Sequence, residues 1–181
     1  MRVFLDFEAS SLAKASYPIE VGWVFEDGTE EAHLIRPAPA WTDWDPSAEA
    51  LHHIPRERLL AEGEPHDAVA RRMFEVLDGH ALYVTSPSWD GKWLSVLLRA
   101  AGLPRHALRL RDADEAHQEA AMEILAPAGF GDRAQAIIHR ARQHAAGRTV
   151  RHRALDDAHQ ERDLWLTIRR AAEVVVLAHQ L

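Results

Sequence analysis

The fold is decided by a short stretch near the start of the chain, Val3-Phe4-Leu5-Asp6-Phe7-Glu8. β-Branched and aromatic residues alternate with others in it, a pattern that predicts a β-strand. Successive side chains of a strand point to opposite faces of a sheet, so this stretch should present two different surfaces. One surface would hold Val3, Leu5 and Phe7, and the other would hold Phe4, Asp6 and Glu8.

Two further strands are predicted directly after this one. Residues Ile19 to Phe25 and Glu31 to Ile35 have strand composition, and Asp27-Gly28 lies between them. An Asp-Gly dipeptide between two such runs is a strong hairpin signal. The first three strands should therefore form an antiparallel meander.

Helices and strands alternate in the remainder of the chain. The predicted elements are a loop from Pro37 to Pro46, two short helices, a helix from Asp67 to Leu77, a strand from Ala81 to Thr85, a helix from Lys92 to Ala101, a short strand near Leu108, a mixed helical region to Ala146 and a long helix from Leu155. Later strands that enter through helices predict a mixed sheet with helices on both faces, an α/β fold. We expect residues 1–181 to form a single domain, because no linker divides them.

Composition excludes several classes of protein. With 47% apolar and 27% charged residues, the chain should be globular and ordered. It has no cysteine, which excludes disulfides, thiolate metal sites and a cysteine nucleophile. No apolar run approaches the length of a membrane span, and Asp6 interrupts any signal-peptide core, so a cytoplasmic location is expected.

The formal net charge of −7 opposes simple electrostatic binding of nucleic acid. A protein of this charge that acts on a polyanion needs divalent cations and a local basic rim. We expect Arg151 and Arg153 to contribute to such a rim. The other arginines of that region are interpreted as a solvated face: Arg109, Arg111, Arg140 and Arg142.

Asp6 and Glu8 are the first candidates for chemistry. They are two residues apart on one strand, so both carboxylates project from the same face. An ionised carboxylate is costly to bury without a partner, and hard oxygen ligands suit Mg²⁺ or Mn²⁺. The alternative for this common triplet is an edge strand with a solvated polar face.

Asp90 is the second candidate, placed just before the helix predicted from Lys92. An acidic residue there could simply stabilise the positive end of the helix. The preceding residues, however, run from a buried strand directly into an amphipathic helix. Such junctions are where α/β folds build their sites.

His152 and Asp157 form the third candidate set. Five residues on a continuous helix would turn them about 140° apart. They converge only if His152 lies in a loop before the helix, which residues Gly147 to Arg151 permit, and Asp157 lies in its first turns. An imidazole can take a proton from water near neutral pH. Asp156 is the alternative to Asp157.

The order of these three elements resembles the three motifs of the DEDDh branch of the DnaQ-like 3′–5′ exonucleases. The segment 152–158 is similar to the third motif of that family. Tyr17 to Gly22 is similar to its second strand, and Ala50 to Ile54 to a segment that often contains His-Gly-Ile. The resemblance spans residues 3 to 166.

The resemblance implies a ribonuclease H-like fold and two-metal phosphodiester hydrolysis of a single-stranded or short nucleic acid. Asp6, Glu8, Asp90 and Asp157 would hold two Mg²⁺ or Mn²⁺ ions, and His152 would deprotonate the attacking water. It also implies contacts to the 3′ end of RNA or DNA from Phe7, Ala9, Ser10, His52, Ser86 and Trp89.

The sequence also departs from the family pattern at positions that contact substrate in relatives. Ala9-Ser10-Ser11 stands where many members have Thr-Thr-Gly, Ser86 where Asn is frequent, and His53 where Gly is frequent. These departures leave the choice between RNA and DNA open. Trp41, Trp44 and Trp89 are expected in loops, where a base could stack on them. Trp23, Trp93 and Trp165 are expected in the core.

Two other functions compete with the nuclease. One is a binding module with the same fold and an inactive site. The other is an unrelated metallohydrolase that uses the histidines of residues 51–53 and 139–144, although their spacing matches no closed zinc set. The run Val174 to Leu177 is wider than one inward stripe requires, so a homodimer is a further possibility.

Overall fold

A six-stranded mixed sheet forms the centre of the computed structural model, which describes residues 1–146 and 152–179. The strands are β1 (Arg2–Ala9), β2 (Pro18–Phe25), β3 (Glu30–Arg36), β4 (Glu64–Pro65), β5 (Ala81–Val84) and β6 (Leu110–Asp112). Their order across the sheet is β4-β3-β2-β1-β5-β6. β1 is therefore an interior strand, with β2 antiparallel on one side and β5 parallel on the other.

The predicted antiparallel meander is confirmed. β2 pairs with β1 and β3 in antiparallel register, and Asp6 lies opposite Gly22. The hairpin closes through Phe25, whose N–H donates to the carbonyl of Thr29 at 2.8 Å. Gly28 has φ 97°, a conformation that favours glycine, which is why Asp-Gly is a strong signal at this turn.

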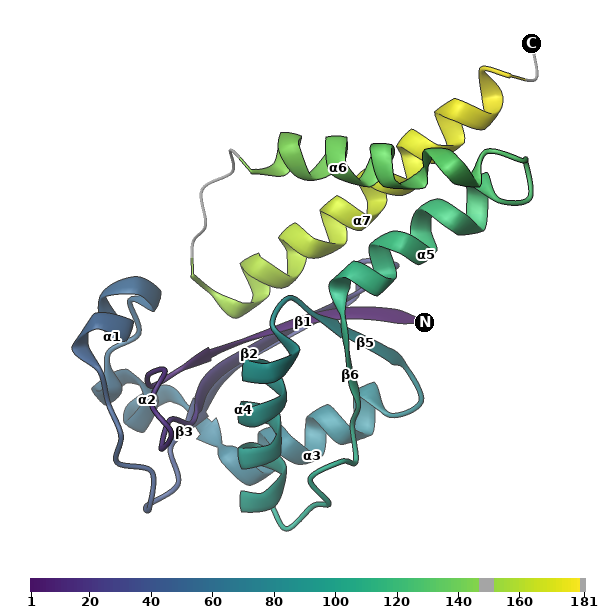
Figure 1. Ribbon diagram of the computed structural model, residues 1–181. Coiled ribbons are helices and arrows are strands. Elements are labelled where there is room, and N and C mark those ends of the chain that lie inside the picture. The colour runs from purple at the N-terminus through teal and green to yellow at the C-terminus, as the bar shows by residue number, and fades with distance from the viewer. Residues whose placement is uncertain (147–151, 180–181) are drawn as a thin grey trace.

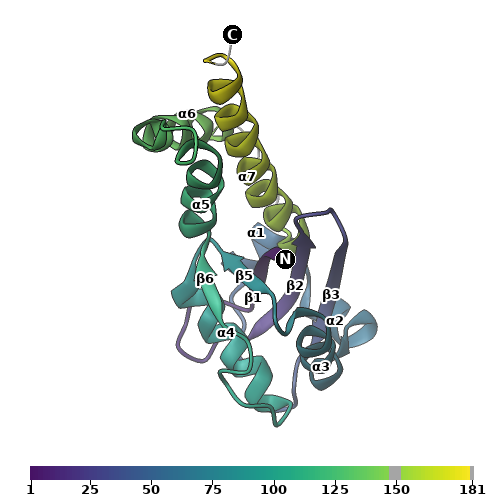
Figure 2. The same cartoon turned by 90° about the vertical axis from the view of Figure 1, so that its right-hand side faces the viewer.

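Helices cover both faces of the sheet (Figures 1 and 2). They are α1 (Pro46–His52), α2 (Arg56–Glu62), α3 (His66–Leu77), α4 (Pro87–Ala100), α5 (Ala113–Leu125), α6 (Ala134–Ala145) and α7 (Ala154–Leu177), with a 3₁₀ turn, η1 (Gly131–Arg133). Helices α3 and α4 lie on one face, and α5, α6 and α7 lie on the other (Figure 1). This arrangement confirms the predicted α/β class.

The alternation along β1 divides the apolar core into two layers. Val3, Leu5 and Phe7 are buried against α3 and α4. Phe4 is buried on the opposite face, against α5, α6 and α7. Asp6 and Glu8 follow Phe4 on that second face, so the two acids lie under the helical layer that contains α7. Trp23, Trp93 and Trp165 are buried, as predicted.

The start of α4 differs from the prediction. The helix begins at Pro87 and not near Lys92, so Asp90 lies in its first turn rather than before it. Proline is favoured at the first helical position, because it has no N–H to leave unpaired there. Trp89, expected in a loop, consequently lies on the helix. Trp41 and Trp44 do lie in loop segments.

The C-terminal part of α7 exposes two apolar side chains. Val174 and Leu177 are exposed, whereas Val175 and Val176 pack against the α5–α7 layer. A homodimer through this surface stays a prediction. In the part of the chain that the structure describes, none of the helices combines the length and apolar character needed to cross a bilayer.

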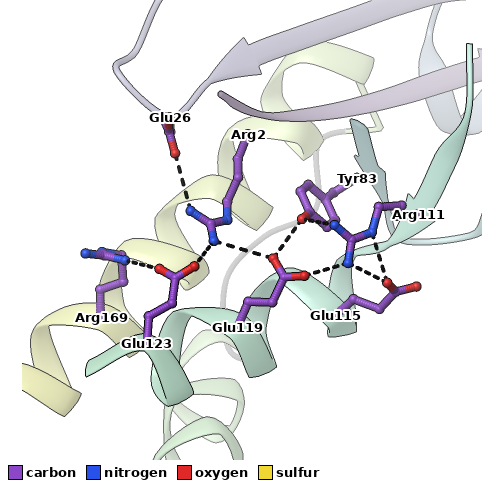
Figure 3. Close-up of polar contacts among 8 residues, drawn as sticks. All are labelled: Arg2, Glu26, Tyr83, Arg111, Glu115, Glu119, Glu123 and Arg169. Carbon is purple, nitrogen blue, oxygen red and sulfur yellow. Dashed lines mark hydrogen bonds and ion pairs between the residues drawn. The ribbon is translucent and has the colours of Figure 1, made fainter. Parts of the chain in front are cut away.

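A network of charged and polar side chains ties the α5–α7 layer to the sheet (Figure 3). At its centre, Glu119 of α5 accepts hydrogen bonds from the Tyr83 hydroxyl, at 2.9 Å, and from the guanidinium of Arg111. Arg2 of β1 pairs with Glu119 and with Glu123. Burial acts to raise the pKa of Glu119, but the hydrogen bonds from Arg111 and Tyr83 outweigh it and lower the pKa.

Replacing Glu119 by alanine should lower the free energy of unfolding by about 1 kcal/mol, because Tyr83 and Arg111 lose a shared acceptor. The effect stays modest because 34% of the Glu119 side chain is exposed to solvent. Urea unfolding measures it. The matched control is Glu62→Ala, which removes an exposed pair with Arg58 within α2 and should leave the unfolding midpoint close to that of the wild type.

Candidate active site

Three carboxylates from two distant parts of the chain meet at one point. Asp6 and Glu8 of β1 and Asp157 of α7 each place an oxygen within 4.8 Å of the other two. Among the described residues, this is the group of acidic and histidine side chains close enough to hold a metal ion. Asp156 is not part of it, in agreement with the choice of Asp157 from its spacing to His152.

The approach of α7 to the sheet depends on Gly22. A Cβ atom at this position would lie 2.4 Å from the backbone nitrogen of Leu155 and 2.8 Å from the carbonyl carbon of Ala154. Only a glycine permits β2 and the first turn of α7 to come so close. Because Asp6 lies opposite Gly22, this contact brings Asp157 over the two acids of β1.

A buried glutamate holds the first turn of α7 in place. Glu20 of β2 is 3% exposed, and its carboxylate accepts the Ala154 N–H at 3.1 Å and the Arg153 Nε–H at 3.0 Å. A carboxylate here satisfies a free N–H group at the helix start and is favoured by the helix dipole. Glu20 lies in the segment from Tyr17 to Gly22, which resembles the second strand of the exonuclease family, but the sequence predicted no role for it. An acidic residue in an otherwise apolar strand was the feature that could have indicated one.

Asp90 approaches the site from the other face, on the first turn of α4. It is 1% exposed, and the Ser86 N–H donates to its carboxylate at 3.3 Å. Burial raises the pKa of Asp90 to about 7, although the N–H groups of Ser86 and Phe7 act to lower it. Asp90 is outside the group of three, but its charge contributes to the raised pKa of Asp6.

His152 lies two residues before α7, as the spacing argument required. Its backbone has φ 49°, in the left-handed region that a non-glycine residue rarely adopts. The chain therefore turns sharply between His152 and Ala154 before the helix begins. His152 is near enough to Asp157 that its charge would act to lower the pKa of that carboxyl.

The carboxylates repel one another and are partly shielded from solvent. Burial, followed by the charges of Asp90 and Glu8, raises the pKa of Asp6 well above its ordinary value. Burial and the charges of Asp157 and Glu20 raise the pKa of Glu8 to about 8, with Arg153 acting against them. Burial also raises the pKa of Asp157. Without a cation, the site should be partly protonated at neutral pH.

This donor set fits divalent cations. Carboxylate oxygens are the ligands that Mg²⁺ and Mn²⁺ prefer, and a bound cation removes the mutual repulsion that raises these pKa values. Among the described residues, no histidine joins the group of three. In the histidine-rich helix α6, His139 contacts Gln143 and His144 contacts the carbonyl of Arg140, and the described residues of this helix do not belong to a group that could hold a metal ion.

Three of the predicted substrate contacts lie at the end of β1 and are buried. Phe7 and Ala9 pack in the apolar layer beneath α3 and α4. Ser10 is fully buried, and its hydroxyl donates to Asp43 at 2.9 Å. Their side chains stabilise the strand end next to Glu8, so contact with substrate would involve their backbone. The role of each stays a prediction.

The other predicted substrate contacts are His52, Ser86 and Trp89. His52 closes α1 and is buried, with its Nδ1 accepting the Ile54 N–H at 3.1 Å. His53 has φ 56° in the left-handed region, which explains why glycine is frequent here in the family it resembles. Ser86 is exposed at the start of α4, and Trp89 is 37% exposed and stacks on Trp93.

The basic rim expected near the third motif is not seen in the described residues. Arg153 is occupied by its ion pair with Glu20. Arg151 lies outside the described residues, as does most of the loop before His152. Arg111 and Arg142 pair with acidic residues of α5, in keeping with a charge-balanced face.

Comparisons with known proteins identify relatives by structure and not by sequence. No family model matches the chain, and no curated protein matches it. The structure resembles E. coli exonuclease I in complex with a dA16 oligonucleotide, with a TM-score of 0.67 at 15% identity. A zinc-bound complex of the E. coli enzyme with single-stranded DNA gives the same values, and exonuclease I without ligand gives 0.66 at 14%.

These likenesses show that the chain has a ribonuclease H-like fold. They cover 98% of this chain but only 42–43% of the exonuclease I chains. The chain thus corresponds to less than half of the length of the solved structures. At this identity, the comparison concerns the fold, and the activity has to be argued from the residues.

Gly22→Ala should displace α7 and lower the free energy of unfolding by about 2–4 kcal/mol, because the added methyl overlaps backbone atoms that cannot move independently. Thermal or urea unfolding measures this loss. Gly91→Ala is the control. Its added methyl meets nothing within 4 Å, and alanine favours the helix, so stability should stay equal or rise. Equal stability of both variants would contradict the close approach.

The metal-free protein should lose stability as pH rises. Glu8 titrates at about 8 and Asp90 at about 7 in the folded state, above their ordinary values of 4.5 and 3.8. Between these values the folded state binds more protons than the unfolded state, so the free energy of unfolding falls with pH. We expect urea unfolding in EDTA to show a loss of at least about 1.4 kcal/mol between about pH 5 and about pH 8.5.

Mn²⁺ should reverse this loss, because it binds the ionised carboxylates of the folded state only. The double variant Glu8→Gln/Asp90→Asn is the control and should show a smaller fall with pH and a smaller response to Mn²⁺. An unchanged pH dependence in that variant would assign the effect to other groups.

Proposed function

We propose that this chain is a metal-dependent 3′–5′ exonuclease of the DEDDh type. The observation that carries this proposal is the meeting of Asp6, Glu8 and Asp157 within 4.8 Å, with buried Asp90 beside them. Two distant segments supply this cluster, on a fold that exonuclease I also has. Aspartate and glutamate oxygens placed in this way suit a pair of divalent cations.

Asp6, Glu8, Asp90 and Asp157 would hold two Mg²⁺ or Mn²⁺ ions. When bound, such a pair stabilises the attacking and leaving oxygens of a phosphodiester and attracts the phosphate to an otherwise acidic protein. The raised pKa values of Asp6 and Glu8 follow first from burial and then from the same proximity that makes these groups good ligands together.

His152 would act as the general base. Two observations support this role: His152 lies just before the first turn of α7, and it is close enough to Asp157 for its charge to act on that carboxyl. There it would accept the proton of the attacking water as the new phosphorus–oxygen bond forms and the bond between phosphorus and the 3′ oxygen of the shortened strand breaks. That 3′ oxygen would take a proton from water to become a hydroxyl, and the cleaved nucleotide would leave with its 5′-phosphate. The imidazolium would then return the proton to solvent.

The substrate that fits best is a single-stranded 3′ end. Solved complexes of exonuclease I contain single-stranded DNA oligonucleotides, which supports this class of ligand for the same fold. Trp89, exposed on the first turn of α4 near Asp90, offers an aromatic face on which an unpaired base can stack. DNA and RNA are both candidates and are separated by the experiment below.

His152→Ala should reduce kcat by about 10²–10⁴-fold, because the general base is lost while the carboxylates stay in place. The assay follows 5′-labelled single-stranded DNA and RNA with Mg²⁺ or Mn²⁺, where the wild type should give a ladder that shortens from the 3′ end. The faster substrate identifies the preferred nucleic acid.

The matched control is His159→Ala, which removes a histidine on the outer part of α7 that pairs with Glu30. It should retain the activity of the wild type. Absence of cleavage by the folded wild type with metal present would overturn the proposal and favour a binding module with the same fold.

A further inference from the structure

A groove between α4 and the segment that leads to β6 contains basic side chains that have no carboxylate partner among the described residues. It has a volume of about 490 Å³, and its lining includes Arg105, His106 and Arg109 together with Lys92 of α4. Helix α4 and β6 lie side by side, with this segment running along the helix (Figure 2). We propose that this groove binds the phosphate backbone of the single strand whose 3′ end occupies the active site.

The charge of the groove is unusual for this protein. Its lining contains no aspartate or glutamate, although acidic residues exceed basic ones by seven in the whole chain. Many other arginines are neutralised by ion pairs, such as Arg72 with Glu31 and Arg111 with Glu115. Arg105 and Arg109 have no carboxylate partner among the described residues, and both are exposed. Free cations of this kind are the ones that can displace counterions from a phosphate chain.

The groove reaches the turn of α4 that carries Asp90. Pro87 and Gly91 line it, and both belong to the first turns of α4, the same part of the helix that carries Asp90. Lys92 lines the groove, and its ammonium lies 5.1 Å from the ring centre of Trp89, where it donates to the carbonyl of Ala13 and the hydroxyl of Ser16. A strand that stacks on Trp89 would therefore meet Arg109 and Arg105 as it leaves the active site.

The floor of the groove suits bases as well as phosphates. Leu94 and Leu108 are buried beneath it, so an apolar surface lies below the basic side chains. Single-stranded nucleic acid is bound by this combination of cations along the backbone and apolar or aromatic surface under the bases. The larger groove between α1 and α2 lacks this chemistry, because Glu49 and Glu57 line it and would repel phosphates.

The inference rests on the proposed function for the direction of the strand, but its test does not require catalysis. The double variant Arg105→Gln/Arg109→Gln is compared with the wild type for binding of a fluorescent single strand of about 12 nucleotides in Ca²⁺. We expect binding to weaken about 5- to 20-fold. The slope of log K against log salt should fall by about 1.4 in magnitude, because two phosphate contacts are lost.

The control variant Arg140→Gln/Arg170→Gln changes the net charge by the same amount, on exposed positions of α6 and α7. It should retain the affinity and the salt slope of the wild type. Equal effects of the two double variants would mean that binding depends on net charge and not on the groove, and would overturn the inference. An unchanged slope for Arg105→Gln/Arg109→Gln would also overturn it.

Hydrolysis then separates this inference from the proposed function. The groove variant should raise KM for the 12-nucleotide strand and leave cleavage of a dinucleotide unchanged, because a dinucleotide is too short to reach the groove. If the wild type binds the long strand through the groove but cleaves neither substrate, the nuclease proposal fails and the groove stands. If the variant loses dinucleotide cleavage, the arginines act in the active site and the groove inference fails.

Discussion

The contact between β2 and the first turn of α7 determines whether this molecule has a site at all. Asp157 arrives about 150 residues after Asp6 along the chain, and only the approach of α7 to Gly22 brings the two carboxylates together. The approach has an electrostatic cost, because it adds a third partly buried acid to two that already repel each other. Glu20 offsets part of this cost by binding the start of the helix and Arg153.

Glu20 also increases the negative charge of the site, and it raises the pKa of Glu8 as a secondary cause. The arrangement is therefore balanced between forces that hold α7 close and forces that push the carboxylates apart. A divalent cation replaces the repulsion between the carboxylates by an attraction of each carboxylate to the cation. The fold supplies the geometry, and a bound divalent cation would supply much of the stability of the site at neutral and alkaline pH.

Much of the fold could be predicted because the first strand carries its information locally. The alternation from Val3 to Glu8 assigns each side chain to a face, and both faces are as expected. Asp27-Gly28 defines the hairpin by turn chemistry alone. The predicted start of α4, near Lys92, was wrong because Pro87 and Ser88 have the composition of a loop. Proline is nevertheless compatible with the first turn of a helix.

The candidate site could be predicted only where spacing carries meaning. Asp6 and Glu8 share a face because they are two apart, and His152 and Asp157 converge because a helix starts between them. Glu20 and Gly22 could not be assigned in this way, since their partners are Arg153 and Leu155, more than 130 residues away. Long-range contacts of this kind leave no local period in a sequence.

The basic groove also depends on long-range contacts and could not be predicted from the sequence. From the sequence, Arg109 is predicted to belong to a solvated face, and Arg151 and Arg153 are predicted to form the basic rim because they lie beside the third motif. Arg153 turned out to be committed to Glu20, so its charge is not available to a phosphate. Whether a basic side chain has a carboxylate partner depends on which acidic residues the fold brings close to it. For Arg105 and Arg109, this is decided by the packing of α4 beside β6. A net charge of −7 therefore does not exclude a nucleic-acid ligand, provided that unpaired cations collect in one groove beside the carboxylates.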